Sequence, residues 1–302
     1  MPDLEGALLT SEHAARLETT LRSTGGDALT EFLWSARRRL EAARPTREAL
    51  QHARELALVD ATPDGQGRIT PLGAKVADSL TEYGYWKRRG RSHHRAQELD
   101  AVRIEHLRDR RILEIGCGAG VNLLSLQHCA EVVGIDVEPL YLQVTPLLAR
   151  LEGMPSPRRL CAQAEHLPFE DGSFDVALFF GSLPYMHIEQ ALREAARVLR
   201  PGGRIVAIHS DLAQVLWIRA RQRGRRLARP GVFLRELRAA VGMALYPWLG
   251  RLLVQPFAPI HVTRRRTRRW LAHAGLQGSA RDCRTIGNEA CFVAEKPSDE
   301  AR

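Results

Sequence analysis

The chain has 302 residues, an apolar fraction of 44% and a formal net charge of +9. This length exceeds one typical domain, and the composition is ordinary for a globular protein, so we expect a catalytic domain plus a smaller one. The basic excess is nearly all arginine, which favours a genomic base-composition bias over a polyanion-binding surface. The five cysteines form no C-x-x-C pair, and the start MPDLEGALLT lacks the basic stretch and apolar core of a signal peptide. We therefore expect a reduced, cytoplasmic protein.

The N-terminal third predicts helices that are followed by a hairpin. Leu and Ala recur at three- and four-residue spacing over 11–22 and 27–43, and a third helix is expected at about 46–58. The turn at 63–67, with Asp-Gly at its bend, predicts a two-stranded hairpin, and a fourth helix follows at 71–80. This order indicates a small winged-helix-like domain.

That N-terminal domain, placed at residues 1–82, has two interpretations. DNA binding would use the third helix, but Arg47 and Arg54 alternate there with Glu48 and Glu55, whereas a groove-reading face is more uniformly basic. The stretch LVDATPDGQGRITPLG instead resembles the winged N-terminal module of small-molecule O-methyltransferases, which pairs subunits. We favour a homodimerisation module or a substrate cap over DNA binding.

Residues 83–104 are predicted to be an exposed basic linker. His93 and His94 lie there without a Cys, His or acid cluster at metal-site spacing, so we expect no metal. Because the linker enters the next domain, its aromatic residues are candidates to face a ligand cleft: Tyr83, Tyr85 and Trp86.

Residues 105–296 alternate between strand and helix patterns, which predicts a parallel sheet with right-handed crossovers. Strands are expected at 111–116, 131–136, 158–163, 174–180 and 203–209, and helices at 119–129, 139–151, 187–199 and 263–274. The stretch DCRTIGNEACFVAEKP predicts a closing strand pair, and 297–302 a frayed tail.

An insertion at 211–262 separates the fifth strand from the last helix. Helices are expected near 214–223 and 231–245, and the apolar segment 241–260 carries prolines and an arginine that argue against a membrane-spanning helix. A substrate lid, a segment contacting a membrane surface and an ordinary helical core all remain open. The following arginine run, 264–269, is expected to form the solvated face of a helix.

A glycine loop follows the first strand of this domain. Gly116, Gly118 and Gly120 alternate after an apolar run, where glycine allows a sharp turn and a close ligand approach. The next helix offers free N–H groups to an anionic group. Asp136 ends the second strand 20 residues after Gly116, the offset at which a carboxylate meets a ribose hydroxyl.

Four blocks carry a resemblance to a known family. They are LEIGCGAG at 113–120, VVGIDVEP at 132–139, AEHLPFEDGSFDVALFF at 164–180 and REAARVLRPGGRIVAIHS at 193–210. In order and spacing they resemble class I S-adenosylmethionine-dependent methyltransferases, and are most similar to the ubiquinone and menaquinone biosynthesis branch. The resemblance implies a Rossmann-like doubly wound α/β fold, the cofactor S-adenosylmethionine and methyl transfer.

The resemblance also implies roles for individual residues. Gly116, Gly118 and Gly120 would shape the loop beside the methionine part of the cofactor, with Glu114 near its amino group. Asp136 would bind the ribose hydroxyls, Val137 would lie beside the adenine, and Ala164 would meet the adenine edge through its backbone. Gln163 departs from the family, which usually has an acid there, although its carbonyl still accepts a hydrogen bond. Phe180 would flank the sulfonium or belong to the strand core.

The acceptor side is less specified. Tyr185, His187, His209 and Asp211 follow predicted strands at their carboxyl ends, where ligands bind in such sheets. Any of them is a candidate general base. We select Tyr185 and His187 as catalytic candidates, expect His209 to be a buried, hydrogen-bonded core residue, and leave the base unassigned.

The predicted function is therefore methyl transfer to O or C of a small, apolar or aromatic metabolite. Two alternatives remain open, the first motivated by the net charge of +9 and the arginine runs and the second by the winged-helix-like N-terminal domain. One is methylation of RNA or protein, and the other is a non-catalytic DNA-binding regulator that senses S-adenosylmethionine.

Overall fold

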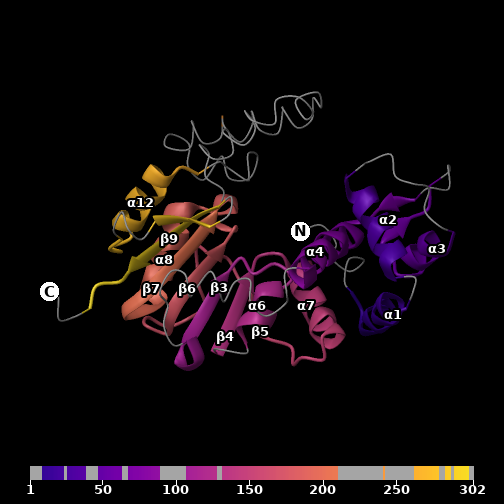
Figure 1. Cartoon of the computed structure of the whole chain (residues 1–302), viewed down its shortest axis with the longest axis horizontal. Coiled ribbons are helices and arrows are strands. Elements are labelled where there is room, and N and C mark those ends of the chain that lie inside the picture. The colour runs from indigo at the N-terminus through magenta and orange to yellow at the C-terminus, as the bar shows by residue number, and fades with distance from the viewer. Residues whose placement is uncertain are drawn as a thin grey trace. The chain divides into compact units, whose positions relative to one another are not determined.

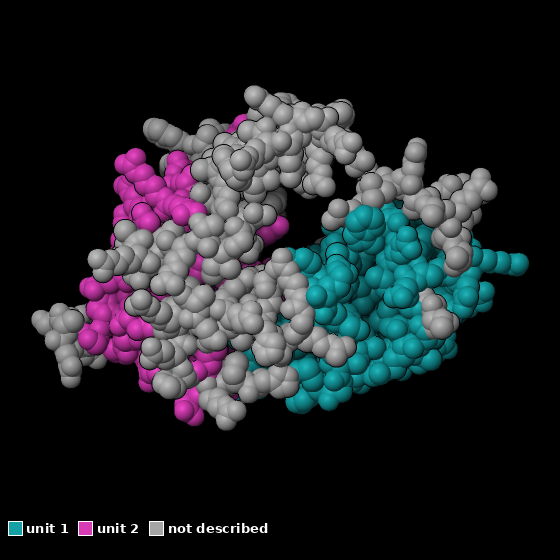
Figure 2. Space-filling view, in the orientation of Figure 1, with its two compact units in different colours: residues 1–96, 118–128, 138–161 teal, residues 97–117, 129–137, 162–302 magenta. Residues whose placement is uncertain are grey.

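The computed structural model describes residues 9–23, 26–38, 47–62, 67–88, 107–127, 131–209, 241, 262–278, 283–286 and 289–298. The chain divides into two compact units, coloured teal and magenta in Figure 2. The first unit joins residues 1–96 to 118–128 and 138–161, and the second holds 97–117, 129–137 and 162–302.

The first unit starts with the predicted helices and hairpin. In chain order they are α1 (Ser11–Arg22), α2 (Gly26–Arg38), α3 (Arg47–Glu55), the strands β1 (Val59–Asp60) and β2 (Arg68–Ile69), and α4 (Pro71–Arg88) (Figure 1). Helix α1 begins after Thr10, whose hydroxyl accepts a hydrogen bond from the His13 N–H at 3.1 Å. The strands pair antiparallel, with Val59 opposite Ile69, which confirms the predicted hairpin.

Two further helices share the core of this unit. They are α6 (Val121–Leu126) and α7 (Pro139–Leu151), and the short strand β5 (Arg158–Cys161) follows them. Leu33 and Val76 of the N-terminal helices lie in the same buried cluster as Leu124 of α6 and Leu147 of α7. Burying each such side chain contributes about 1.5–3 kcal/mol, so the N-terminal helices and α6–α7 stabilise one another.

Helix α4 is longer than predicted. We expected it to end near Leu80 and an exposed linker to follow, but it continues to Arg88. Tyr83 and Trp86 are buried, because the Tyr83 hydroxyl donates to Glu152 and the Trp86 indole N–H donates to Ser125 Oγ at 2.5 Å. The predicted linker was therefore wrong for residues 83–88; His93 and His94 lie outside the described residues.

The large sheet has seven strands in the order β5-β4-β3-β6-β7-β9-β8. Its remaining strands are β3 (Arg111–Ile115), β4 (Glu131–Asp136), β6 (Phe174–Phe180), β7 (Leu199–His209), β8 (Cys283–Ile286) and β9 (Glu289–Glu295). The pairs β3–β4, β3–β6 and β6–β7 are parallel, whereas β9 runs antiparallel to both β7 and β8. The predicted Rossmann-like arrangement and its closing strand pair are confirmed.

Two helices of the second unit, α8 (Ile188–Val198) and α12 (Arg264–His273), pack in one core cluster with the sheet. Ala191 and Ala195 of α8 are fully buried, and Trp270 and Leu271 of α12 are nearly so. Arg265, Arg268 and Arg269 of α12 are exposed. The arginine run is therefore the solvated face of this helix, as predicted.

The predicted insertion at 211–262 lies outside the described residues, except for Val241 and Val262. Its expected helices and the apolar segment 241–260 therefore stay predictions. Among the helices that the structure describes, none is long and apolar enough to cross a membrane.

Two glycines of α4 provide a stability test. A Cβ on Gly73 would stand 2.0 Å from the Leu58 carbonyl oxygen, whereas a Cβ on Gly84 would meet only the flexible end of Arg88 at 3.4 Å. We expect Gly73→Ala to lower the free energy of unfolding by roughly 1–3 kcal/mol through overpacking. Gly84→Ala should raise it by up to about 1 kcal/mol, since alanine is the better helix former. Denaturant unfolding measures both, and equal stability of the two variants would contradict this packing of α4.

Candidate cofactor site

The carboxyl ends of three neighbouring parallel strands meet in the second unit. Glu114 of β3 stands opposite Gly134 of β4 on one side and Leu178 of β6 on the other. The chain leaves β3 at Gly116, and the N–H groups of Gly116 and Cys117 donate to the Ile135 carbonyl at 2.8 and 2.9 Å. The glycine loop therefore starts beside the end of β4, at the sheet edge where ligands bind in parallel α/β folds.

Gly116 needs to be glycine for two reasons. Its φ of +76° is a left-handed conformation that L side chains rarely adopt. A Cβ there would stand 2.4 Å from Cβ of Ser182, in the loop that follows β6. Ser182 is held in that position because its hydroxyl donates to the Ile115 carbonyl at 2.5 Å. The loops after β3 and β6 therefore touch at Gly116.

The other two glycines of the loop belong to the first unit. Gly118 and Gly120 also have positive φ, 55° and 75°. A Cβ on Gly120 would stand 2.7 Å from Cγ2 of Thr145 on α7, so this glycine allows close packing of α6 against α7. Helix α6 covers only six residues of the predicted 119–129, and all six side chains are buried.

Asp136 ends β4 and Val137 follows it, and both are more exposed than Glu114. Glu114 is 1% exposed, Asp136 is half-buried, and Val137 is 65% exposed although it is apolar. The Asp136 carbonyl accepts from the Ala162 N–H at 3.0 Å, which places Gln163 and Ala164 beside the end of β4. Gln163 is exposed and Ala164 is buried. A reachable carboxylate next to an uncovered apolar surface fits a ligand that carries both hydroxyls and an apolar ring.

The candidate residues at and after the end of β6 differ in their exposure to solvent. Phe180 is 9% exposed at the end of the strand, and its neighbour Phe179 is fully buried in the core cluster. Tyr185 ends a short 3₁₀ turn, η2 (Leu183–Tyr185), and its side chain is 58% exposed. His187 precedes α8, and its backbone N–H donates to Glu165 Oε1 at 2.7 Å.

His209 and Asp211 differ from these candidates. His209 is fully buried at the end of β7, where Nε2 lies 3.0 Å from Thr267 Oγ1 and the ring stacks on Phe292. Its expected role as a buried, hydrogen-bonded histidine is confirmed. Asp211 lies outside the described residues. Within the described ranges, no group of three or more His, Cys, Asp or Glu residues is placed to hold a metal ion.

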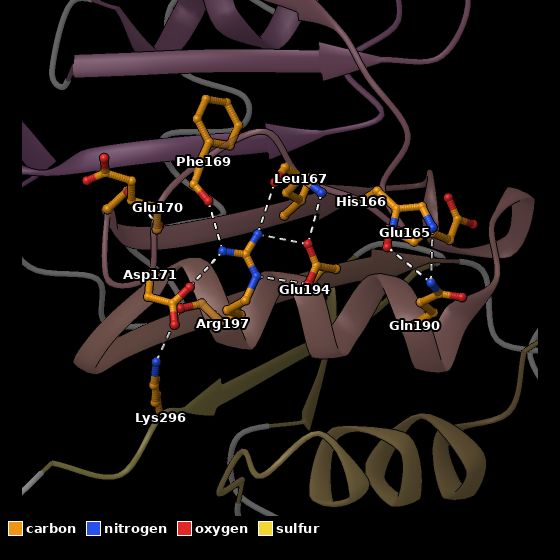
Figure 3. Close-up of polar contacts among 11 residues, drawn as sticks. Glu165, His166, Leu167, Phe169, Glu170, Asp171, Gln190, Glu194, Arg197 and Lys296 are labelled. Atoms are coloured by element: carbon orange, nitrogen blue, oxygen red, sulfur yellow. Dashed lines mark hydrogen bonds and ion pairs between the residues drawn. The ribbon is translucent and has the colours of Figure 1, made fainter.

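Sequence reasoning missed a polar cluster that holds the loop after Ala164 against α8 (Figure 3). The Arg197 guanidinium donates to both oxygens of Glu194, at 2.9 and 2.8 Å, and to Asp171 Oδ1 at 2.7 Å. It also donates to the carbonyls of Leu167 and Phe169, at 3.0 and 2.8 Å. These contacts fix the loop that begins at Gln163 and Ala164. The spacing of Glu194 and Arg197, three residues apart on a predicted helix, could have indicated their ion pair. Nothing in the sequence indicated that Arg197 also binds the loop.

The hydrogen bonds of this cluster shift the pKa values of Glu194 and Arg197. The Arg197 side chain, and secondarily the Leu167 N–H, lower the pKa of Glu194, against an opposing effect of burial. The hydrogen bonds to Glu194 and Asp171 raise the pKa of Arg197. Both groups are therefore charged across the physiological range, and the loop is held by charge-assisted hydrogen bonds.

Comparisons with known proteins identify a methyltransferase domain in this part of the chain. Residues 113–207 match the family model described as "Methyltransferase domain". The chain is 36% identical over 114 residues to the ubiquinone/menaquinone biosynthesis C-methyltransferase UbiE of Bartonella tribocorum, covering 36% of this chain and 44% of that one. It is 42% identical over 103 residues to the demethylmenaquinone methyltransferase of Thermus thermophilus, covering 33% and 46%.

A lipid methyltransferase and a solved structure are also similar. The phthiotriol/phenolphthiotriol dimycocerosates methyltransferase 1 of Mycobacterium ulcerans is 36% identical over 126 residues, with 40% of this chain and 44% of that one covered. The chain thus spans less than half the length of these curated relatives. The structure of a Haloferax volcanii complex between the Trm112 methyltransferase activator and a putative methyltransferase matches with a TM-score of 0.51 and 16% identity, over 74% of this chain and 97% of that one. This last likeness shows the fold alone.

The Arg197 cluster predicts a pH-dependent stability. Because the pKa of Glu194 is lowered on folding, its contribution is fully present above its ordinary value of 4.5 and is lost as pH falls through the lower folded value. We expect Glu194→Gln to lower the free energy of unfolding by about 1–2 kcal/mol at pH 7, with a difference that shrinks toward pH 3. Denaturant unfolding between about pH 3 and about pH 7 measures this difference.

Glu189→Gln on the same helix is the matched control, because its pair with Arg193 spans 3.8 Å and is exposed. Such a pair contributes little, so this variant should follow wild type at every pH. A difference for Glu194→Gln that stays constant with pH would contradict the role of its charge.

Proposed function

Since residues 113–207 carry the methyltransferase domain of the class I S-adenosylmethionine-dependent family, related to its ubiquinone/menaquinone branch, we propose that the chain transfers a methyl group to a small-molecule acceptor. The observation that supports this most is the end of β4. There a half-buried carboxylate, Asp136, precedes the exposed apolar Val137, and the glycine loop starts alongside.

The residues at this edge fit S-adenosylmethionine, the cofactor that the family match implies. Asp136 has the carboxylate that two ribose hydroxyls need, and Val137 offers an apolar surface to the adenine ring. The loop backbone at Gly116 carries no side chain, because a Cβ there would enter the space of Ser182. An acid, Glu114, is buried on the adjacent strand, where it suits a nearby cationic amine.

When bound, the cofactor supplies an activated methyl group on a sulfonium, which is the difficult part of the chemistry. The chain's residues would bind the cofactor and orient it. Asp136 would hold the ribose, Val137 and the Ala164 backbone would hold the adenine with Gln163 at its edge, and the glycines at 116, 118 and 120 would leave room for the methionine part. Phe180 would lie near the sulfonium, where an aromatic face favours a cation. Aligning acceptor and methyl carbon and excluding water is then the main contribution of the protein to rate.

We propose a small, apolar or aromatic acceptor, methylated at C or O. Support comes from the names of the relatives, which are methyltransferases of quinone precursors and of a phthiotriol lipid. Tyr185, with its exposed phenol, and His187 on the same loop are the proposed residues for contact with the acceptor or for proton removal. The apolar segment 241–260 is proposed as a lid or a membrane-surface contact.

For the N-terminal domain, proposed at 1–82, the helix order and the short hairpin support a winged-helix-like module. We propose that it caps the site or pairs two subunits, and that the part of 83–104 that follows α4 joins it to the methyltransferase domain at 105–296. Tyr83 and Trp86 of α4 are buried against Glu152 and Ser125, so α4 is packed within the first unit.

Cofactor binding tests the proposal directly. We expect wild type to bind S-adenosylmethionine, and Asp136→Asn to bind it about ten- to a hundredfold more weakly, because the amide loses the charge-assisted hydrogen bonds to the ribose. Isothermal titration calorimetry gives both affinities. Glu131→Gln is the matched control, since Glu131 lies at the opposite end of β4 and pairs only loosely with Arg111, at 3.7 Å.

Binding that is unaffected in Asp136→Asn would place the ribose elsewhere. Absence of binding by wild type would overturn the proposed function. Once binding is established, labelled methyl transfer to a panel of quinols, phenols and apolar lipids identifies the acceptor class.

A further inference from the structure

The loop after Ala164 lies along helix α8, where its backbone is held at two points. Gln190 Nε2 of α8 donates to the Glu165 carbonyl at 3.2 Å, and the Leu167 N–H donates to Glu194 Oε2 at 2.9 Å (Figure 3). Gln190 and Glu194 are four residues apart and so lie on one face of the helix. The main chain from Glu165 to Leu167 is therefore fixed on that face.

The side chain of Glu165 makes a different contact, with the loop that follows β6. Its Oε1 accepts from the His187 N–H at 2.7 Å. His187 stands at the N-cap position of α8 and ends the segment 182–187, which we call the acceptor loop because it carries Tyr185 and His187. Within this segment the Tyr185 N–H donates to the Ser182 carbonyl at 2.9 Å. A charge-assisted hydrogen bond from Glu165 therefore holds the last residue of the acceptor loop.

Glu165 also adjoins the proposed adenine position. It is half-buried and directly follows Ala164, which is buried and whose backbone would hold the adenine. The two loops, which would contact different ligands, therefore meet at one side chain, and both belong to the second unit. A ligand that orders the backbone at Ala164 also restricts where the Glu165 carboxylate can lie. The acceptor loop then needs less ordering when the second ligand arrives.

We propose that Glu165 is a positioning residue that couples the cofactor side of the site to the acceptor side. Adenine bound at Ala164 would fix the Glu165 carboxylate, and the carboxylate would fix the acceptor loop through the His187 N–H. This inference rests on the proposed function, which places adenine and acceptor at these two loops. Because coupling between two binding sites is reciprocal, a bound acceptor would also strengthen cofactor binding.

Hydrogen exchange of the acceptor loop tests this coupling without a known acceptor. At saturating S-adenosylhomocysteine we expect the wild-type amides at 185–187 to exchange about tenfold more slowly than without ligand. In Glu165→Ala, which lacks the accepting oxygen, the ligand should slow them by about twofold or less. Glu165→Gln keeps a carbonyl oxygen that can accept from the same N–H, so it should restore most of the wild-type effect. Mass spectrometry of peptides that span 182–188 measures these rates.

Glu170→Ala is the matched control. Glu170 is an exposed acid of the same loop, and its backbone carbonyl, not its carboxylate, accepts from Ser173 Oγ at 2.5 Å. This variant should respond to the ligand as wild type does.

A ligand effect of wild-type size in Glu165→Ala would overturn the inference, even if exchange were faster throughout, because Glu165 would then only cap α8. Loss of S-adenosylhomocysteine binding in both Glu165 variants would also count against it, since Glu165 would then be needed for the fold of the site. If wild type binds the ligand and its acceptor loop does not respond, the coupling is absent and the proposed function stands. If wild type does not bind the ligand, the proposed function itself fails.

Discussion

The contact between Gly116 and Ser182 is the constraint on which the candidate site depends. The loops after β3 and β6 touch there, because Gly116 lacks a side chain and the Ser182 hydroxyl is tied to the Ile115 carbonyl. A substitution at Gly116 would have to displace the β6 loop, which also carries Tyr185. The position of the proposed cofactor loop and that of the proposed acceptor loop are therefore set together.

Each unit also has a polar arrangement of its own that holds its elements in place. In the second unit, Arg197 holds the loop that begins at Gln163 and Ala164 against α8 through charge-assisted hydrogen bonds. In the first unit, hydrogen bonds from Trp86 to Ser125 and from Tyr141 to Asp78 hold α4 on α6 and α7. Binding groups held by such contacts need little reordering when a ligand arrives, and this favours affinity.

The sequence was sufficient for the strands and for the positions of the proposed cofactor residues. Buried parallel strands are short apolar runs bounded by glycine or acids, and their carboxyl ends meet at one edge, so the end of the first two strands could be placed beside each other in advance. The roles of Glu114 and Phe180 came from the resemblance to the family. The end of α4 could not be predicted, because the sequence TEYGYWKRRG has the composition of a basic aromatic linker. Only the structure shows that Tyr83 and Trp86 are buried and hydrogen-bonded. The contacts of Arg197 with the loop could not be predicted either, because contacts between a helix and a loop about 30 residues away leave no periodic pattern in the sequence.

A crystal structure of the chain with S-adenosylhomocysteine tests the central claim most directly. We expect the ribose on Asp136, the adenine between Val137 and Ala164, and the amino-acid part beside Gly116 and Gly118. Density for the ligand at any other edge of the sheet, or none at saturating ligand in a form whose strand ends are open to solvent, would contradict the assignment of this edge as the cofactor site.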